Sequence, residues 1–265
     1  MFKHITMKTI LLNTYYRISW WFRKTTTYTE TSHKNMWKVV EYKFRKSNLK
    51  RYFNPYFMNH SEISTVVQHS ERSITPIEDG VRLECKRNTD SNTYDKTPVY
   101  VGYLNTKGKF SQAYGLFELI AKVPERDGFY WPAFWFYGDQ KPAGNQPFEI
   151  DQFEMMDTKH TNSNDTHRMS TTIHWNDSKG IHHQLGRMLY INQDLSKEYH
   201  KYGFKWTTKR LTWYIDYIPV YTLKNKYFTD AMYIVIGAGA KYPYQVGISD
   251  SCEYDLKKLI VHQFL

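Results

Sequence analysis

"QPFEIDQFEMMD", residues 146–157, combines the pattern of a buried β-strand with three carboxylates. Side chains alternate between the two faces of a strand, so Glu149 and Asp151 share one face and the apolar residues beside them share the other. After Asp151 the apolar residues change phase, and uninterrupted alternation would point Glu154 into the core. A β-bulge near residues 152–153 would add one residue, reset the register and return Glu154 to the face of the other two acids.

Three acids on one rigid strand repel one another, so at least one of them is expected to have a raised pKa. A retaining glycosidase uses such a pair: one carboxylate attacks the anomeric carbon, and the other protonates the leaving oxygen. The Cα atoms of Glu149 and Glu154 would lie roughly 13 Å apart, so their side chains must converge to ~5–5.5 Å. Asp151 lies between them, placed to hydrogen-bond the nucleophile. The alternative is a row of solvated acids on an exposed strand.

Short apolar or alternating segments recur from about Met36 onward, separated by turn residues. This spacing, with few helical periods, predicts an all-β fold, a sandwich or jelly roll. Residues 216–219 are predicted to form a hairpin turn, although the usual glycine is missing. The predicted strand segments are residues 79–87, 114–124, 128–139, 169–175, 210–222, 232–239 and 253–264.

The basic charge of the chain belongs to its N-terminal part. Of 36 Lys and Arg and 26 Asp and Glu, residues 1–51 hold 12 and 2, which leaves 24 of each sign in residues 52–265. The main domain is therefore not expected to bind nucleic acid, which needs a basic surface. Residues 1–35 are predicted to be a solvated basic appendage that need not be ordered, and residues 36–265 one β-domain. Binding of nucleic acid or an anionic membrane by the appendage is the alternative.

Cysteine content and hydropathy set further limits. Cys85 and Cys252 are too few for a disulfide framework, and two buried thiols are expected. The sequence contains no apolar run of the ~18 residues that a membrane span needs. The N-terminus resembles an export signal, but Asn13 and Arg17 interrupt its apolar run, so the compartment is left open.

Aromatic residues are placed to form a sugar-binding surface. Alternation in "WPAFWFYG" puts Trp131 and Trp135 on one face, about 13 Å apart by strand rise, where they can stack on sugar rings; the alternative is that they are core residues. His174 alternates away from its apolar neighbours and can contact and tune the acid/base carboxylate, or be an ordinary polar residue. Trp206 and Trp213 are predicted to be core.

The chain resembles glycoside hydrolase family 16. "EIDQFE" is similar to the bulged E-x-D-x-x-E strand of its laminarinase, agarase and carrageenase branches. The flanking segments agree in order: "YGLFELIAKVP" and "GFYWPAFWFYG" before the motif, then "HW", "YHKYGFKWTTKRLTWYID", "MYIVIGAGA" and "EYDLKKLIVHQF" after it. The resemblance covers roughly residues 37–265.

The resemblance implies a β-jelly-roll of two curved antiparallel sheets with an open substrate cleft. It implies Glu149 as nucleophile, Asp151 as its assistant and Glu154 as acid/base. It also implies His174 beside the acid/base and Trp131 and Trp135 as walls of the cleft. A structural calcium ion away from the cleft would use Asp255. The chain departs from the family pattern at "IGAGAKYPY", and residues 88–98 and 158–167 are expected to be loops that set the substrate.

The expected function is endo-acting, retaining hydrolysis of a β-linked polysaccharide, either a β-1,3-glucan or a β-galactan. We expect a monomer that needs no cofactor for catalysis. The resemblance suggests a secreted or cell-surface protein. The alternatives are a non-catalytic carbohydrate-binding protein on the same fold, and a transglycosylase in which a sugar replaces water.

Overall fold

The computed structural model describes residues 37–55, 67–69, 71–87, 99–125, 130–139, 148–155, 166–240 and 251–264. The predicted appendage, the loop at 88–98 and residues 158–165 of the second predicted loop lie outside these residues. Within them, no helix combines the length and hydropathy needed to cross a membrane.

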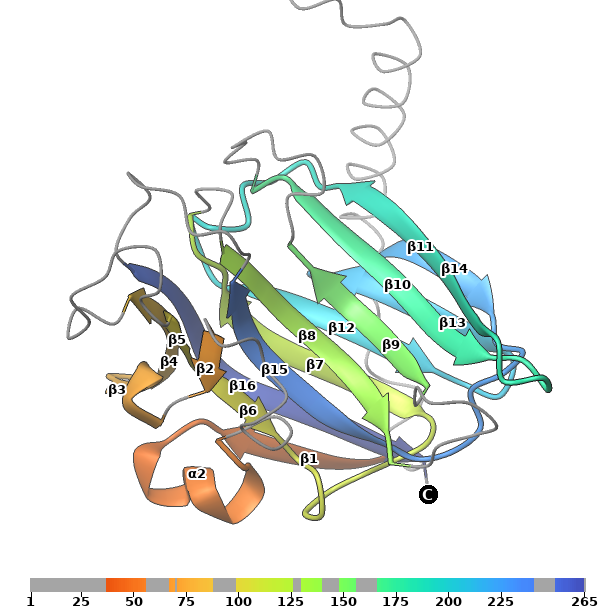
Figure 1. Cartoon of the computed structure of the whole chain (residues 1–265), viewed down its shortest axis with the longest axis horizontal. Helices are drawn as coiled ribbons and strands as arrows, with labels where there is room; N and C mark the ends of the chain where they lie inside the picture. Colours follow the sequence, from red (N-terminus) through yellow and green to blue (C-terminus); the bar gives the residue numbers. More distant parts are fainter. Residues whose placement is uncertain are drawn as a thin grey trace, which may run out of the picture.

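Two sheets form the two layers of the molecule (Figure 1). The larger sheet contains β1 (Trp37–Lys43), β2 (Val67–His69), β3 (Ile74–Ile77), β4 (Gly80–Arg87), β5 (Val99–Val101), β7 (Gly115–Lys122), β12 (His200–Trp206), β13 (Arg210–Ile215), β14 (Ile218–Lys224) and β16 (Ser251–Phe264). Its strand order is β14-β13-β12-β7-β16-β4-β5-β2, with β1 paired to β16 and β3 paired to β4. Its described strand pairs are antiparallel except for β2 with β5.

The smaller sheet contains β6 (Tyr103–Asn105), β8 (Tyr130–Gly138), β9 (Glu149–Glu154), β10 (Arg168–Asn176), β11 (His182–Tyr190) and β15 (Met232–Ala240). Its order is β11-β10-β9-β8-β15-β6, and every pair is antiparallel. The helix α2 (Lys46–Tyr52) and the 3₁₀ turn η2 (Glu71–Ser73) complete the described elements. The predicted sandwich is confirmed, and α2 was not predicted.

Aromatic side chains from both sheets interlock to form the core. Phe136 of the smaller sheet contacts Phe117 and Phe204 of the larger sheet, with ring centroids 4.9 and 5.1 Å apart. Trp206 and Trp213 have no exposed surface, so their prediction as core residues is confirmed. Each such ring contributes about 1.5–3 kcal/mol by leaving water.

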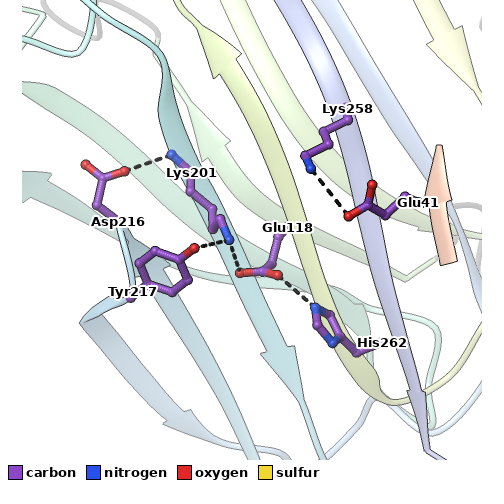
Figure 2. Close-up of polar contacts among 7 residues, drawn as sticks. All are labelled: Glu41, Glu118, Lys201, Asp216, Tyr217, Lys258 and His262. Carbon is purple, nitrogen blue, oxygen red and sulfur yellow. Dashed lines mark hydrogen bonds and ion pairs between the residues drawn. The ribbon is translucent and has the colours of Figure 1, made fainter. Parts of the chain in front are cut away.

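The β13–β14 hairpin shows how the predicted turn forms without glycine. Its two turn residues, Asp216 and Tyr217, have φ of +48° and +69°, which is the left-handed geometry of a type I′ turn. The Asp216 carboxylate accepts a hydrogen bond from the backbone N–H of Lys201 at 2.8 Å. The Tyr217 ring lies 4.0 Å from the Lys201 ammonium (Figure 2). These contacts offset the strain of a left-handed backbone at residues that have a Cβ.

A charged network ties the middle strands of the larger sheet together on the side away from the core (Figure 2). The buried Glu118 carboxylate of β7 pairs with Lys201 of β12 at 3.2 Å and with His262 of β16 at 2.8 Å. Burial acts to raise the pKa of Glu118, but the hydrogen bond from His262 and the charge of Lys201 outweigh it and lower that pKa. Glu118 therefore stays ionised as a structural charge.

Cys85 and Cys252 lie directly opposite each other on β4 and β16. Both thiols are buried and no disulfide joins them, as predicted.

Candidate active site

A β-bulge interrupts β9 at the predicted position. Phe134 of β8 pairs with Phe153, and the next residue, Trp135, pairs with Asp151, so Gln152 has no opposite residue on β8. The ladder between β9 and β10 also shifts register over this stretch. The bulge inferred from the phase of the apolar residues is therefore confirmed.

Side chains from β10 and from the larger sheet supply hydrogen bonds to the backbone at the bulge. The Asp151 carbonyl accepts hydrogen bonds from Trp213 Nε1 at 2.9 Å and from Thr171 Oγ1 at 2.7 Å. The buried Gln152 side chain points toward the larger sheet, where its Nε2 donates to the Gly203 carbonyl at 3.2 Å. A buried polar backbone group without a partner would be destabilising, so these contacts allow the extra residue to persist.

The bulge leaves Glu149, Asp151 and Glu154 on one side of the smaller sheet, while Ile150 and Phe153 enter the core. We call these three acids the carboxylate triad. Asp151 is the most deeply buried, with 1% of its surface exposed, and its carboxyl interacts electrostatically with both glutamates. The triad therefore forms one connected acidic group, not a row of solvated side chains.

Burial and mutual repulsion keep protons on the triad. Burial, followed by the charge of Asp151, raises the pKa of Glu149 to about 9. Burial also raises the pKa of Asp151 and of Glu154. At neutral pH the triad thus holds protons, and because the charges of its members act on one another, the pH dependence of activity should reflect the triad as a whole.

Two predicted site residues contact the triad. Trp131 Nε1 donates a hydrogen bond to Glu154 Oε1 at 3.1 Å. His174 lies opposite Glu149 across the sheet and brings Nε2 to 3.4 Å from Asp151 Oδ2. His174 therefore touches the middle acid, and it acts on Glu154 through its charge, which favours the ionised form of that carboxyl.

An aromatic row extends sideways from Glu149 across the same face of the sheet. Tyr137 of β8 pairs with Glu149, and Tyr233 of β15 pairs with Tyr137, with ring centroids 5.9 Å apart. The half-buried Trp135 stands next to Tyr137, 5.2 Å away between centroids. Tyr137 lies on the same face of β8 as Trp131 and Trp135, so strand alternation could have identified it from the sequence.

His182 is a second residue that the sequence analysis missed. It comes from the exposed strand β11, and its Nε2 lies 3.2 Å from Nδ1 of His174. A donor atom from each of Glu149, Asp151 and His174 lies within 4.8 Å of the others, which makes these three the only potential metal-binding group found among the described residues.

Asp255 lies on the larger sheet, in β16, away from the triad. Its two carboxylate oxygens accept hydrogen bonds from Arg82 Nε at 2.6 Å and Nη2 at 3.0 Å, and Glu253 pairs with the same guanidinium at 2.7 Å. A calcium ion at Asp255 would have to displace Arg82. The calcium site stays a prediction, as does the open cleft.

Comparison with known sequences identifies the family. A family model described as glycosyl hydrolases family 16 matches residues 63–246. "Endo-1,3-1,4-beta-glycanase EglC" of Rhizobium meliloti (strain 1021) is 34% identical over 128 residues, which are 48% of this chain and 24% of that protein. "Glucan endo-1,3-beta-glucosidase A1" of Niallia circulans is 28% identical over 163 residues, 57% of this chain and 22% of that protein. The chain thus spans about a quarter of the length of these curated relatives.

Solved structures of low sequence identity share the fold. A family 16 mixed-linkage glucan protein of Bacteroides ovatus aligns with a TM-score of 0.69 at 22% identity, over 84% of this chain and 99% of that one. The kappa-carrageenase of Pseudoalteromonas carrageenovora aligns with a TM-score of 0.68 at 16% identity, over 90% of this chain and 100% of that one. Since the family match covers more than half of the chain and contains the bulged strand of the carboxylate triad, the chain belongs to glycoside hydrolase family 16.

Proposed function

We propose that this protein is an endo-acting, retaining glycoside hydrolase that cleaves a β-1,3-glucan or a mixed-linkage β-glucan. The observation that carries the proposal is the bulge that brings Glu149, Asp151 and Glu154 to one face of the smaller sheet. The two curated relatives are named an endo-1,3-1,4-beta-glycanase and a glucan endo-1,3-beta-glucosidase, which favours a glucan over the β-galactan alternative. The similarity to the carrageenase supports the fold alone.

In the proposed reaction, Glu149 attacks the anomeric carbon in its ionised form, which its raised pKa makes the minor form of the substrate-free site at neutral pH. Protonated Glu154 donates its proton to the departing glycosidic oxygen. The C–O bond to the leaving sugar breaks as the Glu149–carbon ester bond forms. Water then enters, Glu154 accepts its proton, and the hydroxyl replaces Glu149 with net retention of configuration. Each turnover returns the carboxyls to their starting protonation state.

Asp151 would act on the nucleophile. Burial favours the neutral form of Asp151. Once Glu149 is ionised for attack, that neutral acid would donate a hydrogen bond to it and stabilise the attacking charge. The contact with His174 would hold the Asp151 carboxyl in place. Trp131 would hold Glu154 at the leaving oxygen and stabilise that carboxylate after it has given up its proton.

The test offers the purified chain laminarin, mixed-linkage β-glucan and red-algal galactans, and measures reducing ends and the anomeric configuration of the first product by NMR. We expect cleavage of a β-glucan with retention, and no turnover by Glu149→Gln. Glu154→Gln should lose activity on glucan but keep more of it on aryl glycosides, whose leaving groups need no proton. Glucan binding without any product would favour the carbohydrate-binding alternative, and inversion would refute the mechanism.

A further inference from the structure

A second cross-strand row leads from Glu154 to a tyrosine at the edge of the smaller sheet. Glu154 of β9 pairs with Ala133 of β8, Ala133 pairs with Gly237 of β15, and Gly237 pairs with Tyr103 of β6. Residues that pair directly across strands point to the same face, so all four lie on the side of the carboxylate triad. Leu104, the next residue in β6, enters the core, which agrees with this orientation of Tyr103.

Gly237 lets the Tyr103 ring lie across its neighbouring strand. A Cβ on Gly237 would meet Tyr103 Cε1 at 2.3 Å and Cδ1 and Cζ at 2.5 Å, so the ring occupies the place of the missing side chain. Adjacent strands are about 4.8 Å apart. Because Cζ already lies over β15, the hydroxyl that it carries lies on the side of the ring away from β6, the side of Ala133 and Glu154. Gly237 lies in the stretch "IGAGAKYPY" that departs from the family pattern, and here it makes room for the Tyr103 ring.

The phenol and the acid/base carboxyl face each other along this row with a small residue between them. Ala133 is buried and contributes only a methyl group between them, whereas the larger Trp135 and Tyr137 occupy the next positions of β8 on the same face. Burial, followed by the charge of Glu154, raises the pKa of Tyr103, so its hydroxyl stays protonated and remains a hydrogen-bond donor.

We propose that Tyr103 is a substrate-binding residue that donates a hydrogen bond from its hydroxyl to the sugar lying over Ala133 beside Glu154. This inference rests on the proposed function, because it takes Glu154 as the carboxyl at the cleaved bond. Tyr103 and Glu154 then hold the same sugar from two strands of the sheet, and Gly237 sets the distance between them.

The test measures binding without turnover, in the Glu149→Gln background, by calorimetry with oligosaccharides of β-1,3-glucan and of mixed-linkage β-glucan. Adding Tyr103→Phe keeps the ring on Gly237 and removes only the hydroxyl, and should raise Kd about 3- to 10-fold, the loss of one net hydrogen bond. Adding Gly237→Ala displaces the ring and should weaken binding at least as much. The control is Tyr190→Phe, whose exposed ring stacks on Arg168 outside the two rows.

Kinetics of the otherwise native enzyme complete the test. Tyr103→Phe should raise KM with an unchanged melting temperature, which a purely structural tyrosine would not do. If the wild type cleaves a glucan and Tyr103→Phe alters neither Kd nor KM, this inference is wrong and the proposed function stands. If the wild type cleaves no glucan and the Glu149→Gln protein binds none, both fail.

Discussion

Replacing Trp131 by Phe should move the pH at which activity declines on the alkaline side. The indole N–H donates to Glu154 Oε1 at 3.1 Å, and this hydrogen bond favours the ionised carboxylate, which lowers the pKa of Glu154 against the effect of its burial. Phenylalanine keeps an aromatic face but has no donor. The pKa of Glu154 should therefore rise.

The size of the shift follows from the strength of the bond. A hydrogen bond to a charged group is worth about 1.5–3 kcal/mol, and one pKa unit corresponds to about 1.4 kcal/mol. Glu154 is only half-buried, so water can replace part of the lost hydrogen bond. We therefore expect the pKa of Glu154 to rise by about one unit, which corresponds to the lower end of this energy range. Since the protonated form is the active acid, the alkaline limb of kcat/KM, which reports loss of the last proton from the triad, should move upward by up to that amount.

The assay is the pH profile of kcat/KM on soluble β-glucan between about pH 5 and pH 10. Trp131→Phe will also weaken stacking on sugar, but that lowers the height of the profile and leaves the position of its alkaline limb unchanged. Glu154→Gln, assayed on an aryl glycoside that it still cleaves, serves as the control, because removal of the titrating acid should abolish the limb. A limb that stays in place, or moves to lower pH, would refute the assignment of Glu154 as an acid tuned by Trp131.

Three further predictions concern stability. The pKa of Glu149 is about 9 in the folded state against an ordinary 4.5, so its contribution to stability is full below pH 4.5 and is lost as the pH rises toward 9. Glu149→Gln should therefore raise the melting temperature at pH 8 by a few degrees and hardly change it at pH 4. An equal change at both pH values would contradict this. Trp213→Phe removes one of the two side-chain donors to the Asp151 carbonyl. The free energy of unfolding should fall by about 1–2 kcal/mol, the melting temperature by about 2–8 °C, and kcat should fall as well. An unchanged kcat would show that this contact does not position the triad. Because Asp255 is already paired with Arg82, EDTA should leave the melting temperature unchanged. If EDTA instead lowers the melting temperature, calcium restores it and Asp255→Asn removes the effect, the predicted calcium site is established.

Local patterns in the sequence predicted the parts of the site that lie along one strand. The apolar phase change identified the bulge, because it depends only on alternation within β9. Alternation in β8 likewise put Trp131 and Trp135 on the triad side. Tyr103 could not be found in this way, because its role depends on the register of β6 against Gly237, far along the chain. Register between distant strands is set by packing of the whole sheet.

Contacts between the two sheets explain how the chain keeps three acids in a place that disfavours their charge. Asp151 lies on the side away from the core, but its carbonyl is held by Trp213, a core residue of the opposite sheet. Gln152, the residue added by the bulge, also reaches that sheet. The carboxyls of the triad are therefore held in position by the interior of the sandwich. Burial raises the pKa of all three, and repulsion adds to this at Glu149 and Asp151 instead of separating the side chains. Stability is lost at the triad so that a proton is available for the leaving oxygen, and the core contacts behind the bulge allow the fold to tolerate that loss.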